Sequence, residues 1–342
     1  MKRISILLIC FLLFAGQRSH AQVKVDSIAF FADEKIAEMT LTTDVRKIQN
    51  EKGIDVFQPA TASFRFPDST TVTEEIRIAP RGHFRRDFCP IPPLMLNFHN
   101  PTSPLLNDLG KLKLVIACGA ASDDEQLVLK EYLCYKIYNI LEPKSFRVRL
   151  LRVNFRDSKN KNKPYTQYAF MIEDDAELAR RNGCKTRPDQ MILTENTDRQ
   201  TMTMVATYEF FVSNGDWSVP NNHNTKLIWD RKNEAAPPYV VPYDFDHSGF
   251  VNAGYAAPNE ILGTETVKER VYRGFPRTME ELQTTFDVYR QKKEAIYALI
   301  RNFTLLKERS RKELADYTDD FYKTINNKND VQSIFIDNAR KN

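Results

Sequence analysis

The 342-residue sequence lacks several features that define common protein classes. It has no glycine-rich phosphate loop of the G-x-G-x-x-G or Walker kind. After an apolar run at residues 4–15, no segment is apolar enough to span a membrane. The formal net charge is only +4, so electrostatics give no reason to expect a nucleic-acid partner. No internal repeat and no linker divides the chain, which favours a globular protein with one large or two small domains.

Cysteine is also scarce, with five residues in the whole chain. Cys10 lies within the first apolar run, and the other four are spaced too widely for a zinc motif. They could form disulfides in an oxidising compartment. Cys118 and Cys134 lie in apolar patterns, however, which favours buried free thiols at these two positions.

The N-terminus has the pattern of a secretory signal. Lys2 and Arg3 precede the apolar run, and Ser19-His20-Ala21 is a small-x-small cleavage site. We therefore expect a signal peptide at residues 1–21 and a mature chain that begins at Gln22. The mature protein is expected in the periplasm or outside the cell, without a transmembrane segment.

Residues 214–249 hold a dense set of metal-binding and proton-handling groups. Asn221 follows Asp216 by five residues, and Asp244 comes after a predicted strand, turn and strand. Phosphoryl transfer uses one Asp to orient the attacking hydroxyl, and an Asn and a second Asp to hold the metal. Mg²⁺ prefers such oxygen ligands. We therefore predict that Asp216 orients the acceptor and that Asn221 and Asp244 bind Mg²⁺ or Mn²⁺. Asp246 is predicted as a second ligand or a supporting group.

The order of these motifs resembles the CotH-type secretory kinase family, in which an N-x-D-W…N-N loop precedes a P-W/Y-D-x-D strand end. Here the motifs are Asn214-Gly215-Asp216-Trp217 with Asn221-Asn222, and Pro242-Tyr243-Asp244-Phe245-Asp246. The resemblance implies transfer of the γ-phosphate of ATP, with Mg²⁺, to a hydroxyl of a protein substrate or a small molecule. Its span is about residues 76–251.

The resemblance also implies a fold. We expect an α+β, two-lobed, protein-kinase-like fold with a β-rich N-terminal lobe at residues 22–173. A C-terminal lobe at residues 174–342 would carry the site and a helical tail. A helix is predicted from Ser122 to Leu141, because Ser122-Asp123-Asp124-Glu125 has the pattern of a capping box.

Four residues become candidate nucleotide contacts by the same resemblance. Arg81, beside Gly82, would grip phosphate oxygens, whereas Arg85 and Arg86 fit a solvated turn better. Lys113 would bind the α- and β-phosphates, with Lys111 as its alternate. Glu131, on the predicted helix, would pair with that strand lysine. Glu173 would mark a hinge whose backbone hydrogen-bonds adenine. The family's basic strand reads Pro93-Leu94-Met95-Leu96 here, so the identity of the phosphate-binding lysine stays open.

Two alternative functions remain. Asp244-Phe245-Asp246 is formally the D-x-D metal motif of a glycosyltransferase, which predicts a doubly wound parallel sheet. The missing strand lysine and the scarcity of ATP outside the cytoplasm favour a catalytically inactive pseudokinase or a structural cell-envelope protein.

Overall fold

A computed structural model describes residues 29–53, 56–82, 84–107, 109–119, 121–187 and 190–341. The predicted signal peptide lies outside these residues. Within them, no helix combines the length and the apolar character needed to cross a membrane.

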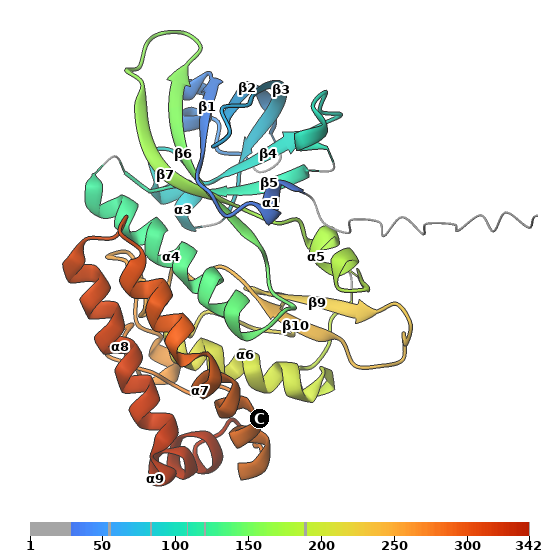
Figure 1. The fold of residues 1–342 in the computed structure, drawn as a ribbon, viewed down its shortest axis with the longest axis vertical. Helices are drawn as coiled ribbons and strands as arrows, with labels where there is room; N and C mark the ends of the chain where they lie inside the picture. The colour runs from blue at the N-terminus through green and yellow to red at the C-terminus, as the bar shows by residue number, and fades with distance from the viewer. Residues whose placement is uncertain are drawn as a thin grey trace, which may run out of the picture.

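The strands in the first half of the described chain form a closed barrel, which is the upper part of Figure 1. They are joined in the order β1-β2-β3-β4-β5-β7-β6, and β6 returns to pair with β1. The strands are β1 (Ala37–Thr43), β2 (Gln58–Arg65), β3 (Thr71–Pro80), β4 (Leu94–Phe98), β5 (Gly110–Val115), β6 (Val148–Asp157) and β7 (Tyr165–Ile172).

The closed barrel shows that the predicted two-lobed, protein-kinase-like fold is wrong, although the mixture of helices and strands is as expected. The difference arises at β1, which pairs with β6 in parallel from Ala37↔Leu151 to Thr43↔Asp157. This pairing closes the sheet and removes its two edges. It joins segments that are distant in sequence, so no local pattern could have predicted it.

Alternating side chains fill the barrel, as the pleat of a strand requires. Along β2, Ala60, Ala62 and Phe64 are buried inside it. Strands β2 and β3 form an antiparallel hairpin. At its turn, Ser69 N–H donates to the Phe66 carbonyl at 2.9 Å, and Ser69 takes a positive φ of 70°.

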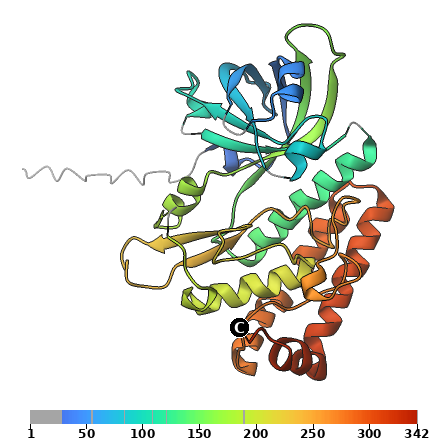
Figure 2. The same cartoon turned by 180° about the vertical axis from the view of Figure 1, so that it is seen from behind.

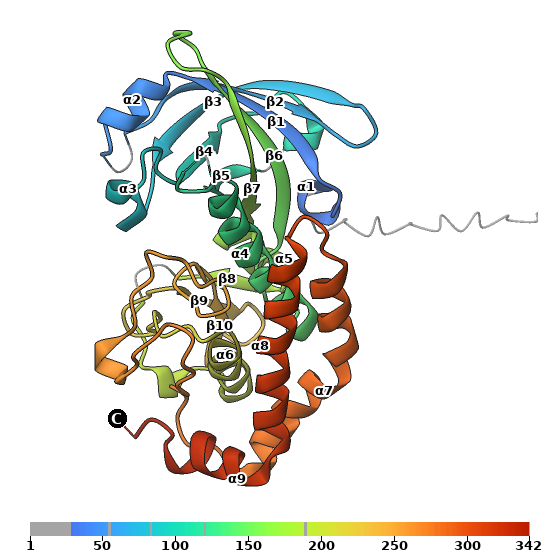
Figure 3. The same ribbon diagram turned by 90° about the vertical axis from the view of Figure 1, so that its left-hand side faces the viewer.

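Helix α4 (Ser122–Leu141) runs below the barrel and packs against α7 (Met279–Asn302), as Figure 3 shows. Its bounds match the prediction, but the capping box does not form, because Ala121 is the N-cap and makes no side-chain hydrogen bond. One hydrophobic core extends from α4 and the outer face of β7 into the lower half. The chain segments before and after residue 173 therefore share a core.

The lower half is mostly helical and contains a three-stranded antiparallel sheet of order β10-β9-β8. Figure 2 shows the β9–β10 hairpin below the barrel, with α6 beneath it. After residue 252 the chain is irregular as far as α7, apart from one 3₁₀ turn at Glu260–Leu262. The elements are α5 (Asp175–Arg181), β8 (Cys184–Thr186), α6 (Arg199–Val212), β9 (Thr225–Asp230), β10 (Tyr239–Pro242), α7, α8 (Glu308–Asn326), α9 (Lys328–Val331) and a π-helical turn (Gln332–Asp337). Three further short helices lie in the upper half, α1 (Ala29–Ala32), α2 (Val45–Asn50) and α3 (Phe84–Phe88).

Candidate functional site

The loop that carries Asp216 is held rigidly at the end of α6. Ser218 and His223 exchange two backbone hydrogen bonds of 2.9 Å, which close the loop into a tight bridge. The Arg273 guanidinium donates to the carbonyls of Gly215 at 2.7 Å and Trp217 at 2.8 Å. These contacts fix the backbone on both sides of Asp216.

The Asp216 side chain is about half exposed, at 47%, and has two polar neighbours. Its Oδ1 lies 2.8 Å from His223 Nε2. Asn224 Nδ2 lies 3.2 Å from its Oδ2 and also donates to its backbone carbonyl at 2.6 Å. The carboxylate is thus oriented by its partners while part of it remains accessible.

Asn224 connects the two segments that carry aspartates. Its carbonyl accepts a 3.0 Å hydrogen bond from Tyr243 N–H, the residue before Asp244. Asn221 is exposed in the turn between Ser218 and His223. The sequence offers four polar residues in a row here. Asn222 and Asn224 both have a left-handed backbone, with φ 49° and 52°, but of the four only Asn224 is buried.

Asp244 lies directly after β10 in a strained conformation, with φ 65°. Its N–H donates to Tyr135 Oη on α4 at 2.8 Å. In the described part of the chain, its half-buried carboxylate makes no hydrogen bond and no salt bridge. Non-glycine residues with positive φ tend to gather at functional sites, and here Asn222, Asn224 and Asp244 do so within one site.

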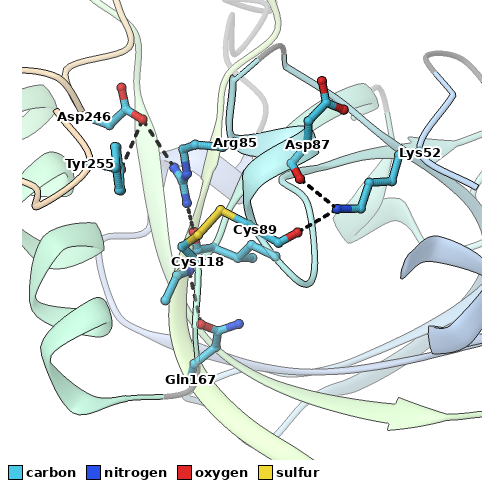
Figure 4. The surroundings of a disulfide bond; sticks show 10 residues. Lys52, Arg85, Asp87, Cys89, Cys118, Gln167, Asp246 and Tyr255 are labelled. Carbon is cyan, nitrogen blue, oxygen red and sulfur yellow. Dashed lines mark hydrogen bonds and ion pairs between the residues drawn. A yellow bond between two sulfur atoms is a disulfide. The ribbon is translucent and has the colours of Figure 1, made fainter. Parts of the chain in front are cut away.

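Asp246 is nearly buried and faces Arg85, as Figure 4 shows. Arg85 Nη1 lies 3.7 Å from Asp246 Oδ2, which also accepts a 3.2 Å hydrogen bond from Tyr255 Oη. Burial and the neighbouring Asp244 raise the pKa of Asp246 to about 6. The hypothesis that Arg85 is solvated is wrong, since its side chain is only 10% exposed. No signal in the sequence separates Arg85 from Arg86, which pairs with its own neighbour Asp87.

Glu131 of α4 belongs to the same cluster and is buried. Burial, Asp246 and Asp244 raise the pKa of the Glu131 carboxyl well above its usual value, while Arg85 opposes the rise. The expected pair between Glu131 and Lys113 is not formed among the described residues, because Lys113 pairs with Asp175 instead. Arginine therefore supplies the compensating charge that we expected from lysine.

Lys113 lies on the outer face of β5 with other cations around it. Its Nζ is 3.7 Å from Asp175 and 4.4 Å from the centre of the Tyr243 ring. Burial lowers the pKa of Lys113, and the positive charges of Arg81 and Lys226 lower it further. The negative charge of Asp175 opposes this shift. Three cationic side chains therefore converge beside Tyr243 and Asp244, an arrangement that suits phosphate oxygens.

The other two candidates for phosphate binding lie differently. Arg81 follows β3, and its Nε is buried without a hydrogen-bond partner in the described chain. A buried donor without a partner is costly, so it suits a site that a ligand completes. Lys111, the alternate of Lys113, instead lies over the Phe57 ring at 5.4 Å.

Glu173 lies at the end of β7 as predicted, but its carboxylate and its backbone N–H already have partners. Its carboxylate is fully buried between Arg147 at 2.7 Å and Arg181 at 2.8 Å. Its N–H donates to the Arg147 carbonyl at 3.0 Å, which leaves no free N–H for adenine. The structure gives Glu173 a stabilising role.

We therefore expect Glu173→Gln to lower the free energy of unfolding by about 3–5 kcal/mol, because it removes the fully buried charge that pairs with the partly buried Arg147 and Arg181. Urea denaturation measures the change. Glu234→Gln is the control, since Glu234 forms exposed pairs with Lys185 and Arg187 and its loss should change stability little. Equal effects of the two substitutions would contradict a structural role for Glu173.

A cavity of about 440 Å³ lies beside Asp216. Its walls are residues 213–216, His247 and part of the irregular segment 257–271. That segment is attached to the loop of Asp216, because Ser213 Oγ donates to the Val267 carbonyl at 2.8 Å. Asp216 therefore faces a space large enough for part of a substrate.

The suitability of the site for a metal follows from its charges. No group of three or more His, Cys, Asp or Glu side chains in the described chain is arranged to hold a metal ion. Mg²⁺, however, is often held by one or two carboxylates, waters and phosphates. The half-buried Asp244 carboxylate has no hydrogen bond or salt bridge in the described chain and lies two residues from Asp246. The residues fit such an ion, with Asp244 as the available carboxylate.

Comparisons with protein-family models and with curated proteins find no match to this chain. The resemblance to CotH-type kinases therefore stays a prediction, based on the motifs alone.

Proposed function

We propose that this protein is an ATP-dependent phosphotransferase, which moves the γ-phosphate with Mg²⁺ to a hydroxyl of a protein or a small molecule. One observation carries the proposal. Asn224 is hydrogen-bonded both to Asp216 and to the backbone beside Asp244, so the loops with the two aspartates form one unit. The unit has a cavity on the side of Asp216 and a cluster of cations beside Asp244.

In this proposal Asp216 accepts a hydrogen bond from the acceptor hydroxyl, which enters from the cavity. Lys113 and Arg81 bind phosphate oxygens, with Lys226 nearby. Asp244 and Asn224 would hold Mg²⁺, which supplies positive charge against the β- and γ-phosphates. Catalysis would come from positioning and charge neutralisation, without a covalent intermediate.

Export of the protein is also a proposal, which the disulfide between Cys89 and Cys118 supports. Disulfides persist chiefly in oxidising compartments. The hypothesis of a free thiol at Cys118 is thus wrong, whereas Cys134 and Cys184 are buried free cysteines.

The test is transfer of label from γ-labelled ATP to casein or to the protein itself, beside uridine diphosphate sugars as donors. We expect transfer from ATP only, and loss of transfer in Asp216→Asn. Transfer from a sugar nucleotide would support the glycosyltransferase instead. The structure gives that alternative little support, since β1 with β6 is the one parallel pair among the described strands.

A catalytically inactive protein is the second candidate, and a specific observation favours it. His223 contacts Asp216 and Arg85 contacts Asp246, so two candidate carboxylates already have partners. This candidate predicts that wild-type protein transfers no phosphate at any Mg²⁺ concentration, whether or not it binds nucleotide.

A further inference from the structure

Helix α3 is poorly anchored for a segment that supplies a site residue. None of its five residues is buried, and Phe84 and Phe88 are 49% and 60% exposed. The guanidinium of Arg85 nevertheless reaches from this helix into the cluster of Glu131, Asp244 and Asp246. Its apolar contacts with the site are those of Phe84 and Phe88 with the rings of His247 and Tyr255, so a covalent attachment would hold it more firmly.

The disulfide supplies that attachment. Cys89 N–H donates to the Arg85 carbonyl at 2.9 Å, and Cys89 is bonded to Cys118 after the end of β5. Arg85 Nη2 in turn donates to the carbonyl of Ile116, two residues before Cys118. Arg85, Cys89, Cys118 and Ile116 thus form a closed ring of contacts. Figure 4 shows Arg85 and the disulfide beside Asp246. Lys52 adds a weaker link, donating to the Cys89 carbonyl at 3.0 Å.

We propose that Arg85 is a positioning residue of the site and that the Cys89–Cys118 disulfide holds it there, so that only the oxidised protein has a competent site. The idea rests on the proposed function, to which it adds a redox requirement. Arg85 acts through the nearly buried Asp246, whose carboxylate lies 3.7 Å from its Nη1. Without Arg85, the Asp246 carboxylate would lose its counter-charge, and the Asp244 segment two residues away would no longer be held in place.

The chemistry of opening the ring is ordinary thiol–disulfide exchange. A thiolate of dithiothreitol attacks one sulfur, and the mixed disulfide then cyclises, which leaves two protein thiols and oxidised dithiothreitol. Helix α3 would then keep the links from Lys52 and Arg85 and the ring contacts of Phe84 and Phe88 with the lower half. Loss of a residue that orients a site typically costs 10- to 100-fold in metal affinity or activity.

The experiment is a double-mutant cycle on Mg·ATP affinity. The four proteins are wild type, Cys89→Ser with Cys118→Ser, Arg85→Met, and all three substitutions together. We expect about a 10- to 100-fold loss of affinity from Arg85→Met and a loss from the cysteine pair. In the Arg85→Met background the cysteine changes should cost nothing more, because they act through Arg85. Cys184→Ser, which removes a free cysteine elsewhere, should bind as wild type does.

Wild-type affinity in Arg85→Met, or fully additive losses in the cycle, would overturn the proposal. Hydrogen exchange measured without nucleotide tests whether the disulfide holds the site, even if the protein binds no ATP. On reduction, the amides of residues 85–89 and 244–248 should exchange faster together, with α7 unchanged. Faster exchange at residues 85–89 alone, or throughout the protein, would show that the disulfide does not hold the site.

Discussion

Asp244→Ala is expected to abolish metal-dependent binding of ATP. The Asp244 carboxylate is half-buried, without a hydrogen bond or salt bridge in the described chain, beside three cations. Asp246 cannot replace it readily, because Arg85 and Tyr255 already hold that carboxylate. Calorimetric titration with ATP at several Mg²⁺ concentrations should show a large loss of affinity, recovered in part at high Mg²⁺.

Two controls make that result specific. Asp287→Ala removes an exposed carboxylate on α7 and should leave the affinity unchanged. The melting temperature of Asp244→Ala should stay close to that of wild type, because the substitution removes a polar group and little core volume. Wild-type affinity in Asp244→Ala would contradict its assignment as the metal ligand.

Asp216→Ala is expected to give the opposite pattern, with ATP binding nearly intact and transfer lost. Asp216 faces the cavity, and its role is to orient the acceptor hydroxyl. Loss of a general base typically lowers the rate by ~10²–10⁴-fold. The measurement is the rate of transfer of labelled phosphate, beside calorimetric affinity for Mg·ATP.

The comparison of the two variants separates their roles. If Asp216→Ala loses affinity as completely as Asp244→Ala, the division of roles between the two loops is incorrect. Asp216→Ala also removes the hydrogen-bond partner of His223, so the released histidine could itself change binding. His223→Ala therefore belongs beside it, to show whether an effect on binding comes from the histidine.

The sequence predicts the local elements well, because their signals are local. The bounds of α4 depend on residues within a single segment, and they are found as predicted. The barrel was missed because its closure depends on the pairing of β1 with β6, whose residues are far apart in the chain. A kinase-like fold inferred from motifs in the second half could not predict how the first half closes.

The residues of the candidate site also fall into those that local sequence can predict and those that it cannot. Asp216 and Asp244 could be selected from their spacing, and the structure brings their loops together through Asn224. Arg85 could not be selected, because its place depends on a disulfide between two separate segments. Glu173 could be selected by its place in the sequence, but its contacts with Arg147 and Arg181 give it a structural role.

Binding of Mg·ATP at the cluster around Asp244 can be measured by calorimetric titration of wild-type protein with ATP, first in Mg²⁺ and then in excess chelator. We expect saturable binding at one site in Mg²⁺ and a large loss of affinity in chelator. Absence of binding at every Mg²⁺ concentration would contradict the phosphotransferase proposal and leave the structural interpretation in its place.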